Sequence, residues 1–166
     1  MFTSLFTAPF PSPFVSAAFS PRDINGLQLW LKADAIVGLN DGDSVTTWPD
    51  SSGNGNDATQ STAAQKPVYK VNIVNGKPVV RFDGTDDYLT LGDVAALDFG
   101  TNPFSILLVG ILSENDSRIF LKDDSAGAGN GFYLTRGTDQ FTYFGGSHIV
   151  IGVADENKHI LEVVRS

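Results

Sequence analysis

The sequence predicts an all-β protein, a sandwich of two antiparallel sheets that is preceded by an extended N-terminal arm. Of its 19 acidic residues 16 are Asp, which favours turns over helices, and 17 Gly and 8 Pro add further turn formers. Roughly ten short apolar stretches follow one another at the 8–12-residue spacing typical of sandwiches. None of them keeps a 3.6-residue period over ten positions. A chain of 166 residues is long enough for one such domain.

The arm comprises residues 1–21, which carry no charged side chain, whereas all 30 charges lie in residues 22–166. Three prolines between residues 8 and 14 exclude a regular helix, so we expect an extended arm. It lacks the basic segment of a signal peptide, and it is too short and too proline-rich to span a membrane. It is expected either to be a loose tail, or to fold back on its own domain, or to dock into neighbouring subunits. The docking residues would be Phe2, Phe6, Phe10, Phe14 and Phe19.

The first half of the body is expected to contain strands at residues 27–33, where leucines alternate with other residues, and at 45–48, where Pro49 ends the strand. Residues 38–44 and 50–57 consist almost entirely of turn formers and predict loops. Asn75-Gly76 between two apolar runs predicts a hairpin of residues 66–74 and 77–82.

The second half is expected to continue with a strand at 88–91 and one helical turn at 94–97. The apolar run 104–112 predicts a strand central to the core. Shorter strands are expected at residues 118–122, 132–135, 140–144, 149–153 and 158–164.

Several of these pieces resemble the start of a laminin-G-like, concanavalin A-like jelly-roll domain. They are GLQLWLKAD (26–34), Trp48 followed by DSSGNGNDAT (50–59), Pro67-Val68-Tyr69, and NGKPVVRFDGTDDYL (75–89). The resemblance implies a two-sheet jelly roll of the kind found in phage virion proteins and bacterial surface proteins. Such domains are usually longer, so we expect the domain at 22–166 to be incomplete at its C-terminus.

The sequence contains neither the carboxylate motif of a glycoside hydrolase nor the nucleophile motif of a serine hydrolase, and we expect no enzymatic activity. Hydrolases similar to this group use Glu-x-Asp-x-Glu on one strand, but Glu114, Glu156 and Glu162 are isolated from one another. Neither His148 nor His159 lies near a G-x-S-x-G nucleophile motif.

Calcium is the one cofactor that we consider, because it prefers carboxylate and amide oxygens on loops. Neither candidate cluster has the spacing of a calcium-loop motif. The alternative interpretation is that Asp50 and Asp83 accept backbone N–H groups and hold tight turns. The candidate ligands are Asp50, Asn54, Asn56 and Asp57 in one loop, and Asp83, Asp86 and Asp87 in the other.

A glycan-binding surface would need exposed aromatic rings beside polar groups. The candidates are Trp30, Tyr133, Tyr143 and Phe144, whereas Trp48 is expected in the core.

A net charge of −8 without a basic cluster argues against a nucleic-acid partner. The favoured hypothesis is a non-enzymatic virion protein, a phage capsid decoration or tail-associated subunit, assembled in the host cytoplasm as a homo-oligomer. Its arm would bind other virion proteins. The alternative is a carbohydrate-binding module or adhesin on a bacterial cell surface that calcium assists.

Overall fold

The computed structural model describes residues 19–98, 104–111, 117–122, 132–136, 140–144, 149–153 and 159–165. Phe2, Phe6, Phe10 and Phe14 of the arm therefore lie outside the described residues, and Phe19 is the first residue within them. None of the described helices is long and apolar enough to cross a membrane.

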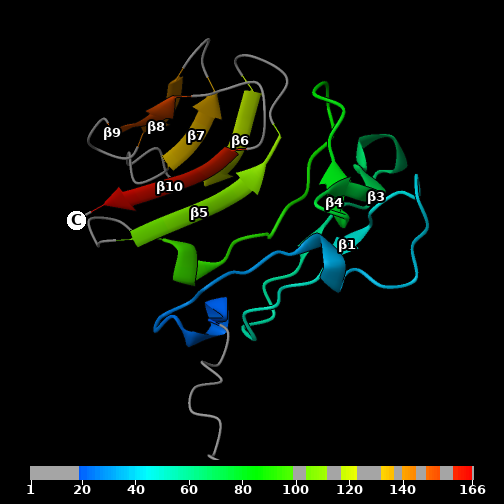
Figure 1. Cartoon of the computed structure of the whole chain (residues 1–166), viewed down its shortest axis with the longest axis horizontal. Helices are drawn as coiled ribbons and strands as arrows, with labels where there is room; N and C mark the ends of the chain where they lie inside the picture. Colours follow the sequence, from blue (N-terminus) through cyan, green and yellow to red (C-terminus); the bar gives the residue numbers. More distant parts are fainter. Residues whose placement is uncertain are drawn as a thin grey trace, which may run out of the picture.

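The described chain consists of short strands and four single turns of 3-10 helix, which confirms the β-rich fold class (Figure 1). The helical turns are η1 (Pro21–Asp23), η2 (Ala33–Ala35), η3 (Ala63–Gln65) and η4 (Ala95–Leu97). The strands are β1 (Thr47–Trp48), β2 (Ala58–Thr59), β3 (Val68–Val74), β4 (Lys77–Arg81), β5 (Phe104–Gly110), β6 (Ser117–Lys122), β7 (Phe132–Arg136), β8 (Gln140–Phe144), β9 (Ile149–Val153) and β10 (His159–Arg165).

The hairpin of β3 and β4 confirms the prediction from Asn75-Gly76. Both turn residues have positive φ, 51° at Asn75 and 75° at Gly76, as the favoured two-residue hairpin turn requires. The hairpin is linked to the preceding chain by a backbone hydrogen bond in which Val45 N–H donates to the Pro67 carbonyl at 2.8 Å. Strands β1 and β2 form an antiparallel pair. At its end, the backbones of Thr59 and Thr90 donate to each other at 2.8 and 2.9 Å.

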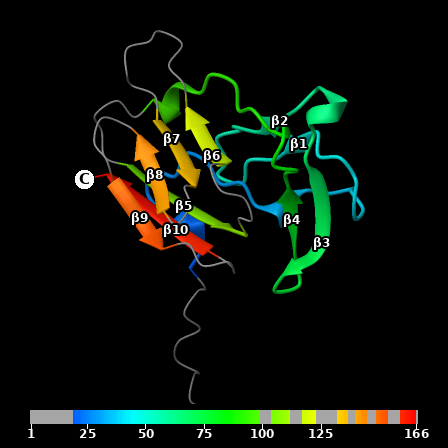
Figure 2. The same ribbon diagram turned by 90° about the horizontal axis from the view of Figure 1, so that it is seen from above.

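The later strands form a second group, made of the antiparallel pair β5–β10 and a four-stranded sheet in the order β6-β7-β8-β9. The register pairs Leu107 with Glu162 and Val109 with Ile160. Figures 1 and 2 together show the four-stranded sheet on one side of the β5–β10 pair and η1 on the other. The described strands form four separate antiparallel sheets, and they do not close into the expected two-sheet sandwich.

The core of the first group surrounds Val45, which is fully buried, with Ile36 and Tyr69 beside it. The side chains that pack against these three are Leu39, Trp48, Val80 and Leu89, so the expectation that Trp48 lies in the core is confirmed.

Three predicted strands need correction. Residues 27–33 form no strand, although Leu31 makes one isolated bridge to Asp50. The strand predicted at 88–91 is reduced to the bridge between Thr59 and Thr90. The run 104–112 is a strand, but it is not central to the core, because Leu107 and Val109 are 67% and 62% exposed.

Candidate functional site

The loop of residues 50–57 is organised around the carboxylate of Asp50. Its Oδ1 accepts the N–H of Trp30 at 3.0 Å and the N–H of Ser52 at 2.8 Å. Its Oδ2 accepts the Ser52 hydroxyl at 2.6 Å and the Asn56 N–H at 3.1 Å. Asp57 completes the loop, because its Oδ1 accepts the Asp50 N–H at 2.8 Å. Both oxygens of Asp50 are therefore engaged within the protein.

The two asparagines of this loop reach across to the backbone of residues 27 and 28. The side-chain amide of Asn54 donates to the Leu27 carbonyl at 2.9 Å and to the Gln28 carbonyl at 3.1 Å. The amide of Asn56 donates to the same Gln28 carbonyl at 3.0 Å. At residues 27 and 28, these side chains occupy carbonyls that a neighbouring strand would otherwise bind, within the strand that was expected at residues 27–33.

The ionised form of Asp50 is favoured by these contacts. Partial burial acts to raise the pKa of Asp50, but the hydrogen bonds from Ser52, Trp30 and Asn56 outweigh it and hold the pKa below its ordinary value of 3.8. Asp50 is thus an anionic hub for backbone donors, as the turn interpretation expects.

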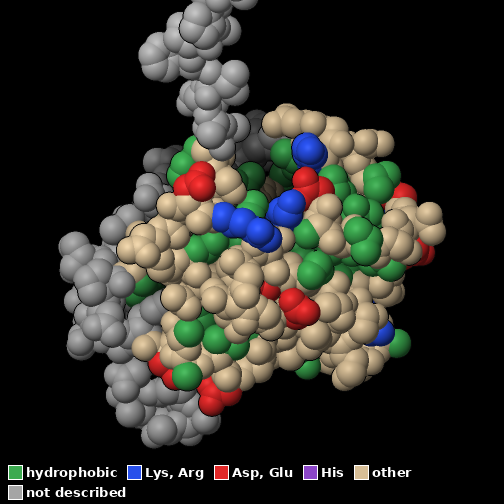
Figure 3. All heavy atoms as spheres, turned by 90° about the horizontal axis from the view of Figure 1, so that it is seen from below, with side chains coloured by type: hydrophobic (Ala, Val, Ile, Leu, Met, Phe, Trp, Pro, Cys, Tyr) green, Lys and Arg blue, Asp and Glu red, His purple; other side chains and the backbone are tan. Residues whose placement is uncertain are grey.

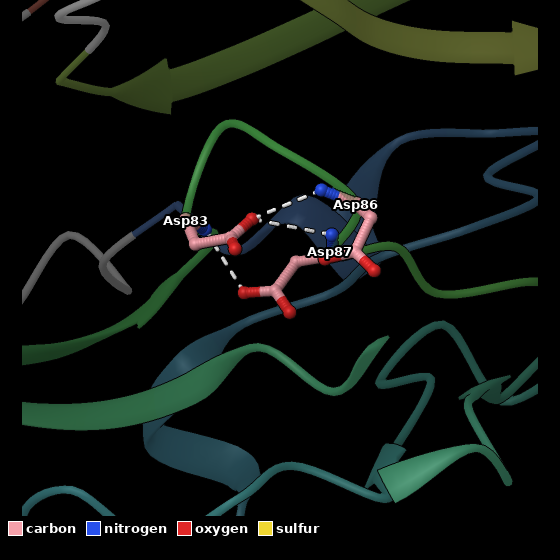
Figure 4. A group of neighbouring side chains, drawn as sticks. All are labelled: Asp83, Asp86 and Asp87. Carbon is pink, nitrogen blue, oxygen red and sulfur yellow. Dashed lines mark hydrogen bonds between the residues drawn. The ribbon is translucent and has the colours of Figure 1, made fainter. Parts of the chain in front are cut away.

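The second acidic loop, residues 83–87, is closed by reciprocal hydrogen bonds (Figure 4). Asp83 Oδ1 accepts three N–H groups, from Thr85 at 2.8 Å and from Asp86 and Asp87 at 3.2 Å each. In return, Asp87 Oδ2 accepts the Asp83 N–H at 2.9 Å. The arrangement resembles a capped helix start, and it satisfies donors that the tight turn would otherwise leave unpaired.

The carboxylates of Asp83, Asp86 and Asp87 each place one oxygen within 4.8 Å of the others. The N–H of Thr85 is the main cause that lowers the pKa of Asp83. Burial, and then the charges of Asp83 and Asp86, raise the pKa of Asp87 despite the hydrogen bond from Asp83. The loop therefore contains two carboxylates whose proton affinities are shifted in opposite directions.

A calcium ion would find an incomplete ligand set in this loop. Of the six oxygens of its three carboxylates, Asp83 Oδ1 and Asp87 Oδ2 already accept backbone donors, which leaves four. Calcium takes six to eight oxygen ligands, so this cluster falls short without further donors. Among the described residues, the carboxylates that gather within this distance are those of Asp83, Asp86 and Asp87, and neither Asp50 nor Asp57 belongs to the group. Calcium binding stays a prediction.

The aromatic candidates lie in separate parts of the chain. Trp30 is half-buried beside Asp50, and the Lys32 ammonium lies 5.3 Å from the centroid of its ring. Tyr133 of β7 is paired with Phe144 of β8, whereas Tyr143 is paired with Leu134. The register therefore aligns Tyr133 with Phe144, and the proposed glycan platform stays a prediction.

The sequence did not indicate a basic residue that two acids share. Lys122 of β6 is 15% exposed, and its Nζ lies 2.9 Å from Asp93 and 2.9 Å from Asp98, the acids on either side of η4. The hydrogen bonds that Lys122 donates to Asp98, and then to Asp93, raise the pKa of Lys122. No local motif could reveal this contact, because Asp93 precedes Lys122 by 29 residues.

Comparison with known proteins gave no assignment: no protein-family model, no curated protein and no solved structure matches the chain.

Proposed function

We propose that this chain is a non-enzymatic structural subunit of a virion, a phage capsid decoration or tail-associated protein. Its β-rich head would be displayed outward, and its N-terminal arm would bind neighbouring subunits. The observation that carries the proposal is the composition of residues 1–21, which hold five of the 12 Phe and four of the eight Pro but no charge.

The chemistry of the arm suits burial in an assembly. A segment with five Phe side chains exposes a large apolar area when it is left in water. Prolines reduce the conformational freedom that such an arm would lose on docking, because each fixes one backbone dihedral. A flexible arm loses conformational entropy when it becomes ordered on binding, and this loss is a main cost of association. A stiff arm loses less, so its binding is opposed by a smaller entropy term.

The acidic loops of the described head fit the non-enzymatic part of the proposal. Asp50 and Asp83 between them accept seven hydrogen bonds, four at Asp50 and three at Asp83, and six of the donors are backbone N–H groups. Carboxylates that are engaged in this way stabilise loops and are poorly placed for acid–base work. The resemblance to laminin-G-like domains of virion proteins points in the same direction.

Mass spectrometry of purified particles tests the proposal directly, and we expect the chain to be present in stoichiometric amount. The fourfold variant Phe2→Ser, Phe6→Ser, Phe10→Ser and Phe14→Ser should be lost from particles while the head stays folded. Val37→Ser is the matched control, because Val37 is an apolar residue of the head that is 87% exposed. Absence of the wild-type chain from particles, or normal incorporation of the fourfold variant, would contradict the proposal.

The alternative function is a glycan-binding module of a bacterial surface. A glycan array, run once with added calcium and once with a chelator, distinguishes it from the virion proposal. Under the virion proposal we expect no glycan signal that depends on Trp30 or Tyr133. Binding that is lost in Trp30→Ala would favour the module, and loss of binding in chelator would add calcium to it.

A further inference from the structure

Three asparagines of the described chain, Asn25, Asn54 and Asn75, are each followed by a glycine. An asparagine side chain is lost most readily before glycine, because a residue without Cβ does not obstruct attack by its own backbone nitrogen on the preceding side chain. All three asparagines are exposed, and nothing lies within 4 Å of a Cβ built on the glycine that follows each of them. Sequence and steric access therefore do not distinguish these three sites. A fourth such pair, Asn130-Gly131, lies outside the described residues.

Hydrogen bonding does distinguish the sites, and it restrains Asn54 on two sides. The side-chain amide of Asn54 donates to the carbonyls of Leu27 at 2.9 Å and Gln28 at 3.1 Å, and to the Ser52 hydroxyl at 3.1 Å. The backbone N–H of Asn54 donates to the same hydroxyl at 3.2 Å. Loss of the side-chain nitrogen would break the three contacts that this nitrogen makes, so the fold opposes the reaction at Asn54.

Asn75 is restrained by the hairpin of β3 and β4. It is the first residue of the two-residue turn, with φ of 51°, and the paired residues Val74 and Lys77 flank the turn. Attack by the next backbone nitrogen closes a ring that includes the asparagine backbone, so it changes the torsion angles of this residue. At Asn75 that change must distort a turn which the strand pair fixes.

Asn25 has neither restraint. It follows η1, the blue helical turn in Figure 1, and lies in a turn that is closed by a hydrogen bond from Leu27 N–H to the Ile24 carbonyl. This bond is 3.4 Å long, beyond the usual range for an N–H donor and a carbonyl. Within the described part of the chain, the Asn25 side chain has no hydrogen-bond partner and the Gly26 N–H has no acceptor. The Gln28 side chain donates to the Gly26 carbonyl at 3.1 Å, a contact that leaves the Gly26 nitrogen accessible.

We propose that Asn25 is a site of spontaneous deamidation, at which the folded protein converts the side-chain amide to a carboxylate, whereas hydrogen bonding protects Asn54. In the first step the Gly26 nitrogen loses its proton to solvent and attacks Cγ of Asn25. A bond between that nitrogen and Cγ forms, the Cγ–Nδ2 bond breaks, and Nδ2 takes up a proton from solvent and leaves as ammonia. Water then opens the cyclic imide at either carbonyl, which gives aspartate or isoaspartate. The reaction needs no oxidant or reductant.

The reaction changes both the charge and the backbone of the turn through which the chain enters the head. Either product adds one negative charge, and isoaspartate also inserts a carbon into the backbone ahead of Leu27, whose carbonyl binds Asn54. On the face that Figure 3 shows, acidic and basic side chains lie among polar and hydrophobic atoms. Because Asn25 is exposed, the new carboxylate stays hydrated, and we expect the folded head to tolerate it. This inference goes beyond the proposed function and does not depend on it.

Peptide mapping tests the proposal, because trypsin places the three sites on separate peptides: 23–32 with Asn25, 33–70 with Asn54 and 71–81 with Asn75. The full chain is incubated at mildly alkaline pH in water enriched in heavy oxygen, so that only products formed during the incubation carry the label. It is then digested in ordinary water at mildly acidic pH, and fragment spectra assign the labelled residue. We expect Asn25 to be labelled at least roughly tenfold faster than Asn54, the factor to which one or two net hydrogen bonds correspond. Asn75 should also be slower than Asn25.

The same chain in urea is the matched control, because urea removes the structure and keeps the sequence. The three sites should then be labelled at similar rates. Asn25→Gln should abolish labelling of peptide 23–32, which separates Asn25 from Gln28 in the same peptide. Ser52→Ala removes the hydroxyl that contacts Asn54, so it should speed labelling of Asn54 and leave Asn25 unchanged. Equal rates at Asn25 and Asn54 in the folded chain, or a gap of the same size in urea, would overturn the inference.

Discussion

Asp83 and Asp87 hydrogen-bond to each other in both directions: Asp83 Oδ1 accepts the Asp87 N–H at 3.2 Å, and Asp87 Oδ2 accepts the Asp83 N–H at 2.9 Å. The two carboxylates nevertheless titrate differently, because Asp83 accepts two additional N–H groups and Asp87 is the more buried of the pair. One short loop therefore contains groups with opposite effects on stability as the pH changes.

Asp87→Asn should stabilise the protein at pH 7. The pKa of Asp87 is raised, chiefly by burial, so its ionised form costs stability at any pH above that pKa. Asn removes the charge and keeps an oxygen that can accept the Asp83 N–H. The gain in melting temperature should shrink as the pH falls through the raised pKa, and it should be absent below the ordinary value of 3.8.

Asp83→Asn is the matched comparison, and it should have the opposite sign. The lowered pKa of Asp83 means that its carboxylate stabilises the fold above pH 3.8, and that this contribution is lost as the pH falls through the folded-state value. Melting curves from pH 3 to pH 7 measure both variants. Parallel curves for the two would contradict the assignment.

Asp50→Ala should destabilise the fold by about 2 kcal/mol, because it removes an anionic acceptor from four partly buried donors. Asp34→Ala serves as the control, since its carboxylate is 42% exposed and makes ion pairs of 3.5 and 3.7 Å. Exposed pairs of this kind contribute at most about 1 kcal/mol. Urea midpoints provide the measurement, and a loss at Asp34 as large as that at Asp50 would refute the hub role.

Gly76→Ala should cost about 1–2 kcal/mol, because a side chain at φ 75° clashes with the following carbonyl. Gly110→Ala is the control within β5, where φ is not positive and nothing lies within 4 Å of an added Cβ. Chemical denaturation compares the two variants. If Gly110→Ala is as damaging as Gly76→Ala, the turn does not limit stability.

Lys122→Met should lower stability by at most about 1 kcal/mol at low salt, because two acids share its ammonium group but both are largely exposed. The loss should diminish in 1 M salt, where the screening length is about 3 Å. Lys77→Met is the control, since Lys77 is 72% exposed and lies 3.7 Å from Asp34. Because the pKa of Lys122 is raised, its contribution is complete below pH 10.5 and is lost as the pH rises through the folded-state value.

The parts of the fold that the sequence predicted well are those set by neighbouring residues. Asn75-Gly76 predicted the hairpin of β3 and β4, and the bounds expected for β8 and β9 agree with the structure. The apolar run of β5 predicted a strand but not the exposure of Leu107, because a run that is apolar at every position does not distinguish its two faces.

The parts that failed depend on distant side chains. Leucine alternation predicted a strand at residues 27–33, but the backbone there is hydrogen-bonded by Asp50, Asn54 and Asn56, 20 to 28 residues later. The shared ion pair of Lys122 was missed for the same reason. Of the two acidic loops, composition predicted both turns and did not predict how many of their oxygens would be engaged.

The dependence of residues 27 and 28 on the loop at 50–57 has a consequence for the order of folding. The contacts that shape the loop join residues two to seven apart, whereas Asn54 meets Leu27 across 27 residues. Short closures are faster than long ones, so the loop should form early and should then serve as a template for the segment that precedes it. During synthesis on the ribosome, residues 27 and 28 could therefore not reach their final conformation until residue 57 had been made.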